Sequence, residues 1–150
     1  MIKQILFLID SAISNEKKAY NYLQMYSKKI DKPSLQNLLI SIINQEKEHE
    51  KQLRDLKQKK NIQNDFNEEL LTIIHLDSFA ALSENETNLI PTQFMQFIMK
   101  YFDQTKSVYD SLATAALDSE LRLFFIKLSD SELKLKQWIQ DRYDLELLSL

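Results

Sequence analysis

The sequence predicts an all-α protein, an antiparallel four-helix bundle in which two helical hairpins are joined by a long crossover containing a short helix. The chain has no glycine and only two prolines, Pro33 and Pro91. Glycine is the usual residue for the positive φ angles of tight turns and phosphate-binding loops, so an all-helical protein tolerates its absence best. Apolar residues also recur at helical spacing over long stretches that polar segments separate. We expect the 150 residues to form one domain, 1–150.

The first hairpin is expected within residues 3–60. Its first helix runs from about Lys3 to Ile30, and the segment DKPS at 31–34 ends it. Ser34 can cap the second helix, which runs from about Leu35 to Lys60. The lysines near its end suit a helix C-terminus and predict a solvated end, not a nucleic-acid patch.

The second hairpin follows a long connection, residues 61–90, in which the apolar segment LLTIIHLDSFAAL predicts a small helix. Pro91 begins the third long helix, which reaches about Leu117. Asp118 can cap the fourth, which continues to about Tyr143 or beyond. The connection is long enough to cross the length of a bundle, so the helices are expected to run up, down, down and up.

Bulk properties exclude several functional classes. A net charge of −3 with mixed signs gives no large basic surface, so nucleic acid is not an expected partner. The absence of cysteine excludes disulfides, thiolate metal sites and cysteine nucleophiles, and weakly favours a cytoplasmic location. The apolar run Ile5–Ile9 ends at Asp10 and is too short for a signal peptide. No run approaches the length of a membrane span, so no membrane partner is expected.

Polar residues interrupt the apolar face of three predicted helices. In the second helix the face that carries Leu39, Ile42 and Leu53 continues through Glu46 and His49. Residues three apart lie on one face of a helix, so these two side chains can bind the same metal ion. Imidazole and carboxylate suit iron, manganese or zinc. A bound cation would also offset the cost of burying ionised carboxylates. The corresponding acids in the other two helices are Glu16 and Glu132.

Two segments of the first hairpin, NEKKAYNYL (15–23) and INQEKEHEKQL (43–53), resemble the first half of a rubrerythrin-type, ferritin-like diiron protein. The shared features are a Glu in the first helix and Glu-x-x-His in the second. YFDQTKSVYDSL (101–112) and FFIKLSDSELKL (124–135) are similar to the second half of that family. The resemblance covers nearly the whole chain and implies a ferritin-like bundle with metal bound between the helices.

The second half departs from the family pattern. An ungapped alignment of the two hairpins pairs three sets of residues: Glu46 with Glu132, Glu16 with Phe102, and His49 with Leu135. Phe102 and Leu135 therefore stand where the resemblance implies the terminal ligands of a second iron, and Met99 stands where some members have a further acid. Asp103 lies about 100° round the helix from the expected position and is not counted as a replacement.

The ligands that the resemblance implies for the first metal are all present: Glu16, Glu46, His49 and Glu132. Other interpretations stay open for each. Glu46 and His49 can be a polar pair in a degenerate core, and Glu132 an acid bonded to His49 or water. Glu16 can be a surface residue beside two lysines. The remaining candidates are not expected to take part in the chemistry. His75 in the crossover is expected to be structural or exposed, and Trp138 to be a core residue or an interface anchor. Four tyrosines are expected to be packing residues and not redox residues: Tyr20, Tyr22, Tyr101 and Tyr109.

Three functional classes follow from these residues. The first is a single-metal binding protein with one Fe, Mn or Zn ion and uncertain or lost redox activity. The second is a metal-free structural or interaction bundle. The third is a diiron oxidoreductase or peroxide-handling protein, which the two replaced ligands disfavour, because the resemblance implies chemistry shared between two irons. A homodimer is expected in each case, because such bundles pair through exposed helix faces.

Overall fold

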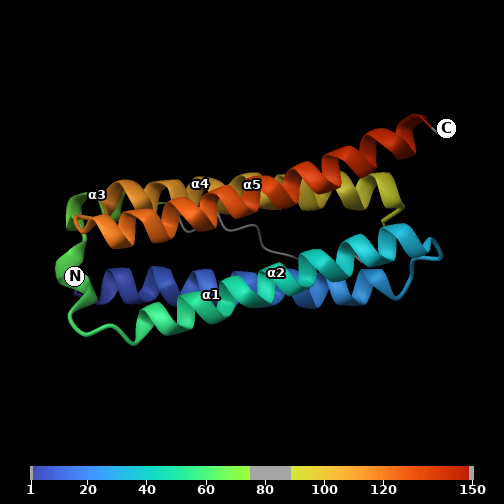
Figure 1. The fold of residues 1–150 in the computed structure, drawn as a ribbon. Coiled ribbons are helices and arrows are strands. Elements are labelled where there is room, and N and C mark those ends of the chain that lie inside the picture. The colour runs from blue at the N-terminus through green and yellow to red at the C-terminus, as the bar shows by residue number, and fades with distance from the viewer. Residues whose placement is uncertain (1, 75–88, 149–150) are drawn as a thin grey trace.

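The protein is an all-α bundle, as predicted. The structure is a computed structural model that describes residues 2–74 and 89–148. Its elements are α1 (Ile2–Ser27), α2 (Pro33–Lys57), the 3-10 helix η1 (Ile62–Asp65), α3 (Glu68–Thr72), α4 (Pro91–Ala115) and α5 (Ser119–Leu148). The α1–α2 and α4–α5 hairpins lie side by side, and the four long helices run up, down, down and up (Figure 1). Among the described residues, no helix has the length and apolar character needed to span a membrane.

The link between α1 and α2 differs from its predicted boundaries. The helix α1 ends at Ser27, not Ile30, and α2 begins at Pro33. The predicted cap at Ser34 is wrong: the N-cap is Lys32, whose backbone is extended and whose side chain makes no capping bond. Proline explains the difference, because it has no N–H to satisfy and its fixed φ suits the first helical position.

The second helix, α2, ends at Lys57, three residues before the predicted Lys60. The lysines at this end are solvated, as expected. Lys57 and Lys59 are each 42% exposed, and they form ion pairs with Asp10 and Asp65 at 2.7 and 3.1 Å. Asn61 follows with φ 57°, which is the left-handed conformation that glycine usually supplies. Asparagine tolerates this region better than most residues, so it provides the turn in a chain without glycine.

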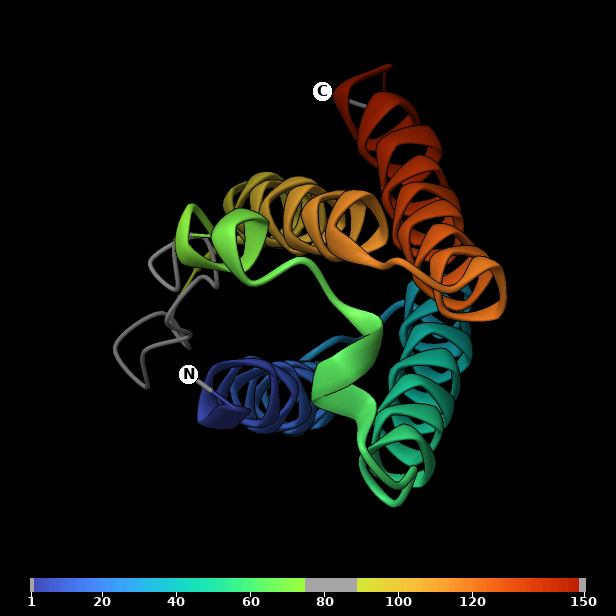
Figure 2. The same ribbon diagram turned by 90° about the vertical axis from the view of Figure 1, so that its left-hand side faces the viewer.

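A short helix of the crossover overlaps the start of the predicted one. It is α3, capped by the Asn67 side chain, which accepts a bond from the Leu70 N–H at 3.3 Å. The preceding η1 was not predicted from the sequence. Backbone bonds join this segment to the α4–α5 link, from Asn67 N–H to Ala115 O at 2.8 Å and from Leu117 N–H to Asp65 O at 2.7 Å. The segment therefore crosses one end of the bundle (Figure 2). The helix α3 ends at Thr72, and the part of the predicted segment from His75 onward lies outside the described residues.

The second hairpin follows its predicted boundaries more closely. Pro91 is the first residue of α4, which ends at Ala115. Asp118 accepts the Leu121 N–H at 3.2 Å, so the predicted cap of the fourth helix is confirmed. The helix α5 continues to Leu148, beyond the predicted Tyr143.

The core consists of two apolar clusters, one towards each end of the bundle. The first cluster includes Ile9 of α1, Leu53 of α2, Leu112 of α4 and Phe125 of α5. The second cluster gathers around these residues: Leu23, Leu39, Ile98, Phe102 and Leu135. Along every long helix the two clusters are separated by buried polar residues, which we call the polar layer: Glu16, Glu46, His49, Thr105, Ser129 and Glu132.

The aromatic residues that were expected to be structural are core residues. Tyr22, Tyr101 and Tyr109 are buried. Tyr20 and Trp138 are partly buried and pack against the second cluster.

Candidate metal centre

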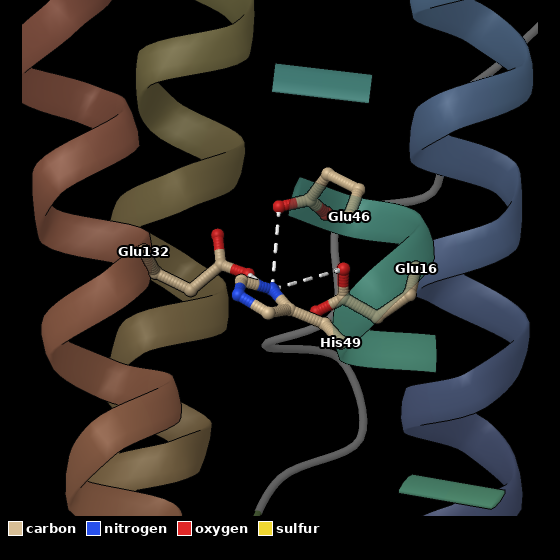
Figure 3. Close-up of side chains that lie close together, drawn as sticks. All are labelled: Glu16, Glu46, His49 and Glu132. Atoms are coloured by element: carbon tan, nitrogen blue, oxygen red, sulfur yellow. Dashed lines mark hydrogen bonds and ion pairs between the residues drawn. The ribbon is translucent and has the colours of Figure 1, made fainter. Parts of the chain in front are cut away.

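The four predicted ligands meet in the polar layer. Glu16 comes from α1, Glu46 and His49 from α2, and Glu132 from α5, and their side chains converge between the helices (Figure 3). One donor atom from each residue lies within 4.8 Å of the other three. The three acids are 0% exposed and His49 is 3% exposed. The site therefore draws on both hairpins and is closed to solvent.

Helical spacing explains why these side chains point inward. Glu46 and His49 are three residues apart, so both lie on the face of α2 that also carries Ile42 and Leu53. The alternative interpretation of Glu16 as a surface residue is wrong. Its lysine neighbours in the chain are exposed, but Glu16 itself lies on the buried face of α1.

The His49 imidazole is held between the acids and a serine. Its Nδ1 lies 3.1 Å from Glu132 Oε1, 3.6 Å from Glu46 Oε1 and 3.7 Å from Glu16 Oε2. Its Nε2 lies 2.7 Å from Ser131 Oγ on α5. When Nε2 donates to Ser131, the neutral ring turns the lone pair of Nδ1 towards the acids. Nδ1 is therefore the nitrogen that a metal ion would use.

A second hydroxyl holds Glu16. The Tyr109 hydroxyl of α4 donates to Glu16 Oε1 at 2.5 Å. Burial, together with the negative charge of Glu16, raises the pKa of Tyr109 well above its ordinary value, so the phenol stays protonated. Neither Tyr109 nor Ser131 was predicted as part of the site, because nothing local in the sequence marks a contact between distant helices.

The acids leave several buried oxygens without a hydrogen-bond partner among the described residues. These atoms are Glu16 Oε2, both oxygens of Glu46 and Glu132 Oε2. Unpaired buried carboxylate oxygens are costly, and natural proteins normally satisfy them with a donor, a water or a cation. A divalent cation fits this donor set of three carboxylates and one imidazole nitrogen.

The surroundings of each acid shift its pKa in a different direction when no cation is bound. Burial acts to raise the pKa of Glu16, but contacts with its neighbours, including the charge of His49, lower it to about 2. Burial and repulsion from the neighbouring acids raise the pKa of Glu46 well above its ordinary value. Burial and repulsion from Glu16 raise the pKa of Glu132 to about 8.

His49 completes this arrangement. Burial acts to lower its pKa, but hydrogen bonds to the surrounding carboxylates, that of Glu132 first, raise it above the ordinary value. Burial and mutual repulsion thus favour the protonated forms of Glu46 and Glu132 in the metal-free site, whereas contacts with its neighbours favour ionised Glu16. A cation would replace these protons.

The positions expected to hold a second set of ligands are apolar. Phe102 and Leu135 are both 0% exposed and belong to the second apolar cluster. Asp103 lies at the surface, where it pairs with Lys136 at 2.9 Å, so it is no replacement ligand. Within residues 2–74 and 89–148, the group of side chains that could hold a metal contains the four predicted residues and no acid from α4.

Comparison with known proteins bears on the identity of the fold. Searches of curated proteins and of solved structures each returned no match. A family model described as Rubrerythrin matches residues 8–134, which include all four residues of the site. The match covers most of the chain and agrees with the helical bundle and its buried Glu/His cluster. The chain therefore belongs to the rubrerythrin family.

Proposed function

We propose that the protein binds a single divalent metal ion, of iron, manganese or zinc, through Glu16, Glu46, His49 and Glu132. The observation that carries this proposal is the set of buried, unpartnered carboxylate oxygens beside His49 Nδ1. A cation would satisfy these oxygens and neutralise acids that otherwise retain protons. Such an ion supplies Lewis-acid or one-electron chemistry when it is bound.

The chain's own residues prepare the site for one ion. Ser131 orients the His49 ring, and Tyr109 orients the Glu16 carboxylate. The helices exclude water from the donors, since none of the acids is exposed. Phe102 and Leu135 fill the positions from which a second ion would be held, so the two-metal chemistry of the family is disfavoured here.

Metal content and affinity test the proposal. Untagged protein purified without chelators is analysed for metal, and the chelator-treated protein is titrated with Fe(II) under anaerobic conditions, with Mn(II) and with Zn(II). We expect about one ion per chain and a loss of tight binding in His49→Ala. Glu48→Gln is the matched control, because Glu48 lies on the same helix but is exposed.

The same titrations can contradict the proposal. Two tightly bound ions per chain would show that the second hairpin contributes ligands and would favour a diiron oxidoreductase. No binding, or equal binding by the His49→Ala variant, would favour a metal-free structural bundle.

A further inference from the structure

The acids of the site differ in how many of their carboxylate oxygens accept hydrogen bonds. Among the described residues, neither oxygen of Glu46 has a hydrogen-bond partner, whereas in Glu16 this holds for Oε2 alone. The difference comes from Tyr109, whose hydroxyl donates to Glu16 Oε1 at 2.5 Å. A hydrogen bond from a hydroxyl to a carboxylate is short and strong, particularly where water is excluded.

We propose that Tyr109 is a specificity-determining residue, which restricts Glu16 to one metal-binding oxygen and thereby lowers the coordination number of the site. This inference rests on the proposed function. The free oxygen, Oε2, already faces the centre of the cluster, 3.7 Å from His49 Nδ1. For Glu16 to bind an ion with both oxygens, Oε1 would have to share its lone pairs between the ion and the buried Tyr109 hydroxyl, which weakens both contacts.

The coordination number affects which metal the site prefers. Zn(II) is commonly four-coordinate, whereas Mn(II) favours six oxygen-rich positions. Tyr109 therefore favours Zn(II) over Mn(II). Without its hydroxyl, Glu16 gains a second available oxygen, and the preference for Zn(II) should weaken.

A matched control lies two turns away on the same helix. Tyr101 is as deeply buried as Tyr109, and its hydroxyl donates to the backbone oxygen of Asn15 at 3.3 Å, not to a ligand side chain. Tyr101→Phe and Tyr109→Phe thus remove the same group from equally buried positions of α4. Only the second change frees a carboxylate oxygen.

The test compares the parent chain with its Tyr109→Phe and Tyr101→Phe variants. Each is titrated with Co(II), whose visible absorption is stronger at low coordination number, and then with Zn(II) and Mn(II) in competition. We expect Tyr109→Phe to absorb more weakly per bound Co(II) and its ratio of Zn(II) to Mn(II) affinity to fall by roughly tenfold. Tyr101→Phe should match the parent in both measurements.

The outcomes separate this inference from the proposed function. If the parent binds Co(II) but Tyr109→Phe shows the parent's spectrum and metal preference, Tyr109 is not specificity-determining and the proposed function stands. If Tyr101→Phe changes as much as Tyr109→Phe, the effect is structural and the inference is also overturned. If the parent binds none of the three metals, and no Fe(II) in the anaerobic titration, both are overturned. Circular dichroism verifies the fold, and Tyr109→Leu is a second variant that removes the hydroxyl.

Discussion

Raising the pH should destabilise the metal-free protein. Burial and repulsion from Glu16 raise the pKa of Glu132 from 4.5 to about 8, so the folded state keeps a proton that the unfolded state loses. Stability therefore falls as pH rises from the unfolded value towards 8, by about 1.4 kcal/mol per pH unit. Between about pH 5.5 and pH 8 the expected loss from Glu132 alone is on the order of 3 kcal/mol.

Three other residues of the site bear on the sign of this effect. Burial and repulsion from the neighbouring acids raise the pKa of Glu46 well above its ordinary value, so Glu46 adds to the loss of stability as pH rises. The raised pKa of His49 acts in the same direction, because its stabilising contribution is complete below 6.5 and is lost as pH rises through the folded value. Glu16 acts at lower pH. Its pKa is lowered to about 2, so its contribution is present above 4.5 and is lost as pH falls towards 2. Within the chosen range Glu16 adds no slope.

Urea denaturation in the presence of a chelator measures this dependence directly. The free energy of unfolding of the parent should decrease steadily over the range, while Glu132→Gln, which cannot ionise, should lose about 1 kcal/mol per pH unit of that slope. A parent whose stability is constant or increases from pH 5.5 to pH 8 would refute the reasoning, since it would mean that Glu132 is ionised in the folded state.

Three further predictions concern the metal. The double variant Phe102→Glu, Leu135→His should bind two ions per chain instead of one. Its metal-free form should lose about 3 kcal/mol or more of unfolding free energy, because both positions are fully buried. Metal analysis and melting with and without Fe(II) test this, and an unchanged melting temperature of the metal-free variant would contradict it. Ser131→Ala should weaken metal affinity by about 10- to 100-fold, measured by calorimetry, since it releases His49 Nε2. Metal affinity should increase with pH, because a bound ion displaces protons from the acids of the site. Calorimetric titrations in buffers of different ionisation enthalpy should detect this proton release, and an affinity independent of pH would contradict it.

Much of the fold could be predicted because each long helix has one continuous buried face. The Glu-x-x-His pair could be placed for the same reason, since two positions three apart must share a face. Local details were less predictable. Ser34 favours the N-cap position, but Pro33 favours the first helical position, and both preferences cannot be met at once. The helix begins at Pro33, so Ser34 lies within its first turn.

The contacts that orient the ligands could not be predicted from the sequence. Tyr109 and Glu16 are 93 residues apart, and Ser131 and His49 are 82 apart. Hydroxyl-bearing residues are common on every helix, and their roles depend on how the two hairpins are rotated and shifted against each other. Helical periodicity determines which face is buried, but it does not determine which atoms meet across the bundle.

The polar layer also bears on how the bundle opens. It separates two apolar clusters, and without a cation the helices meet in this layer through hydrogen bonds, such as those of His49 and Tyr109, in place of apolar packing. We expect the two ends of the metal-free bundle to exchange amide hydrogens as separate cooperative units. A bound ion would tie α1 and α2 to α5 at mid-length and merge the ends into one unit. Slow exchange would then spread outward from the residues around His49, and metal release would become coupled to separation of the hairpins.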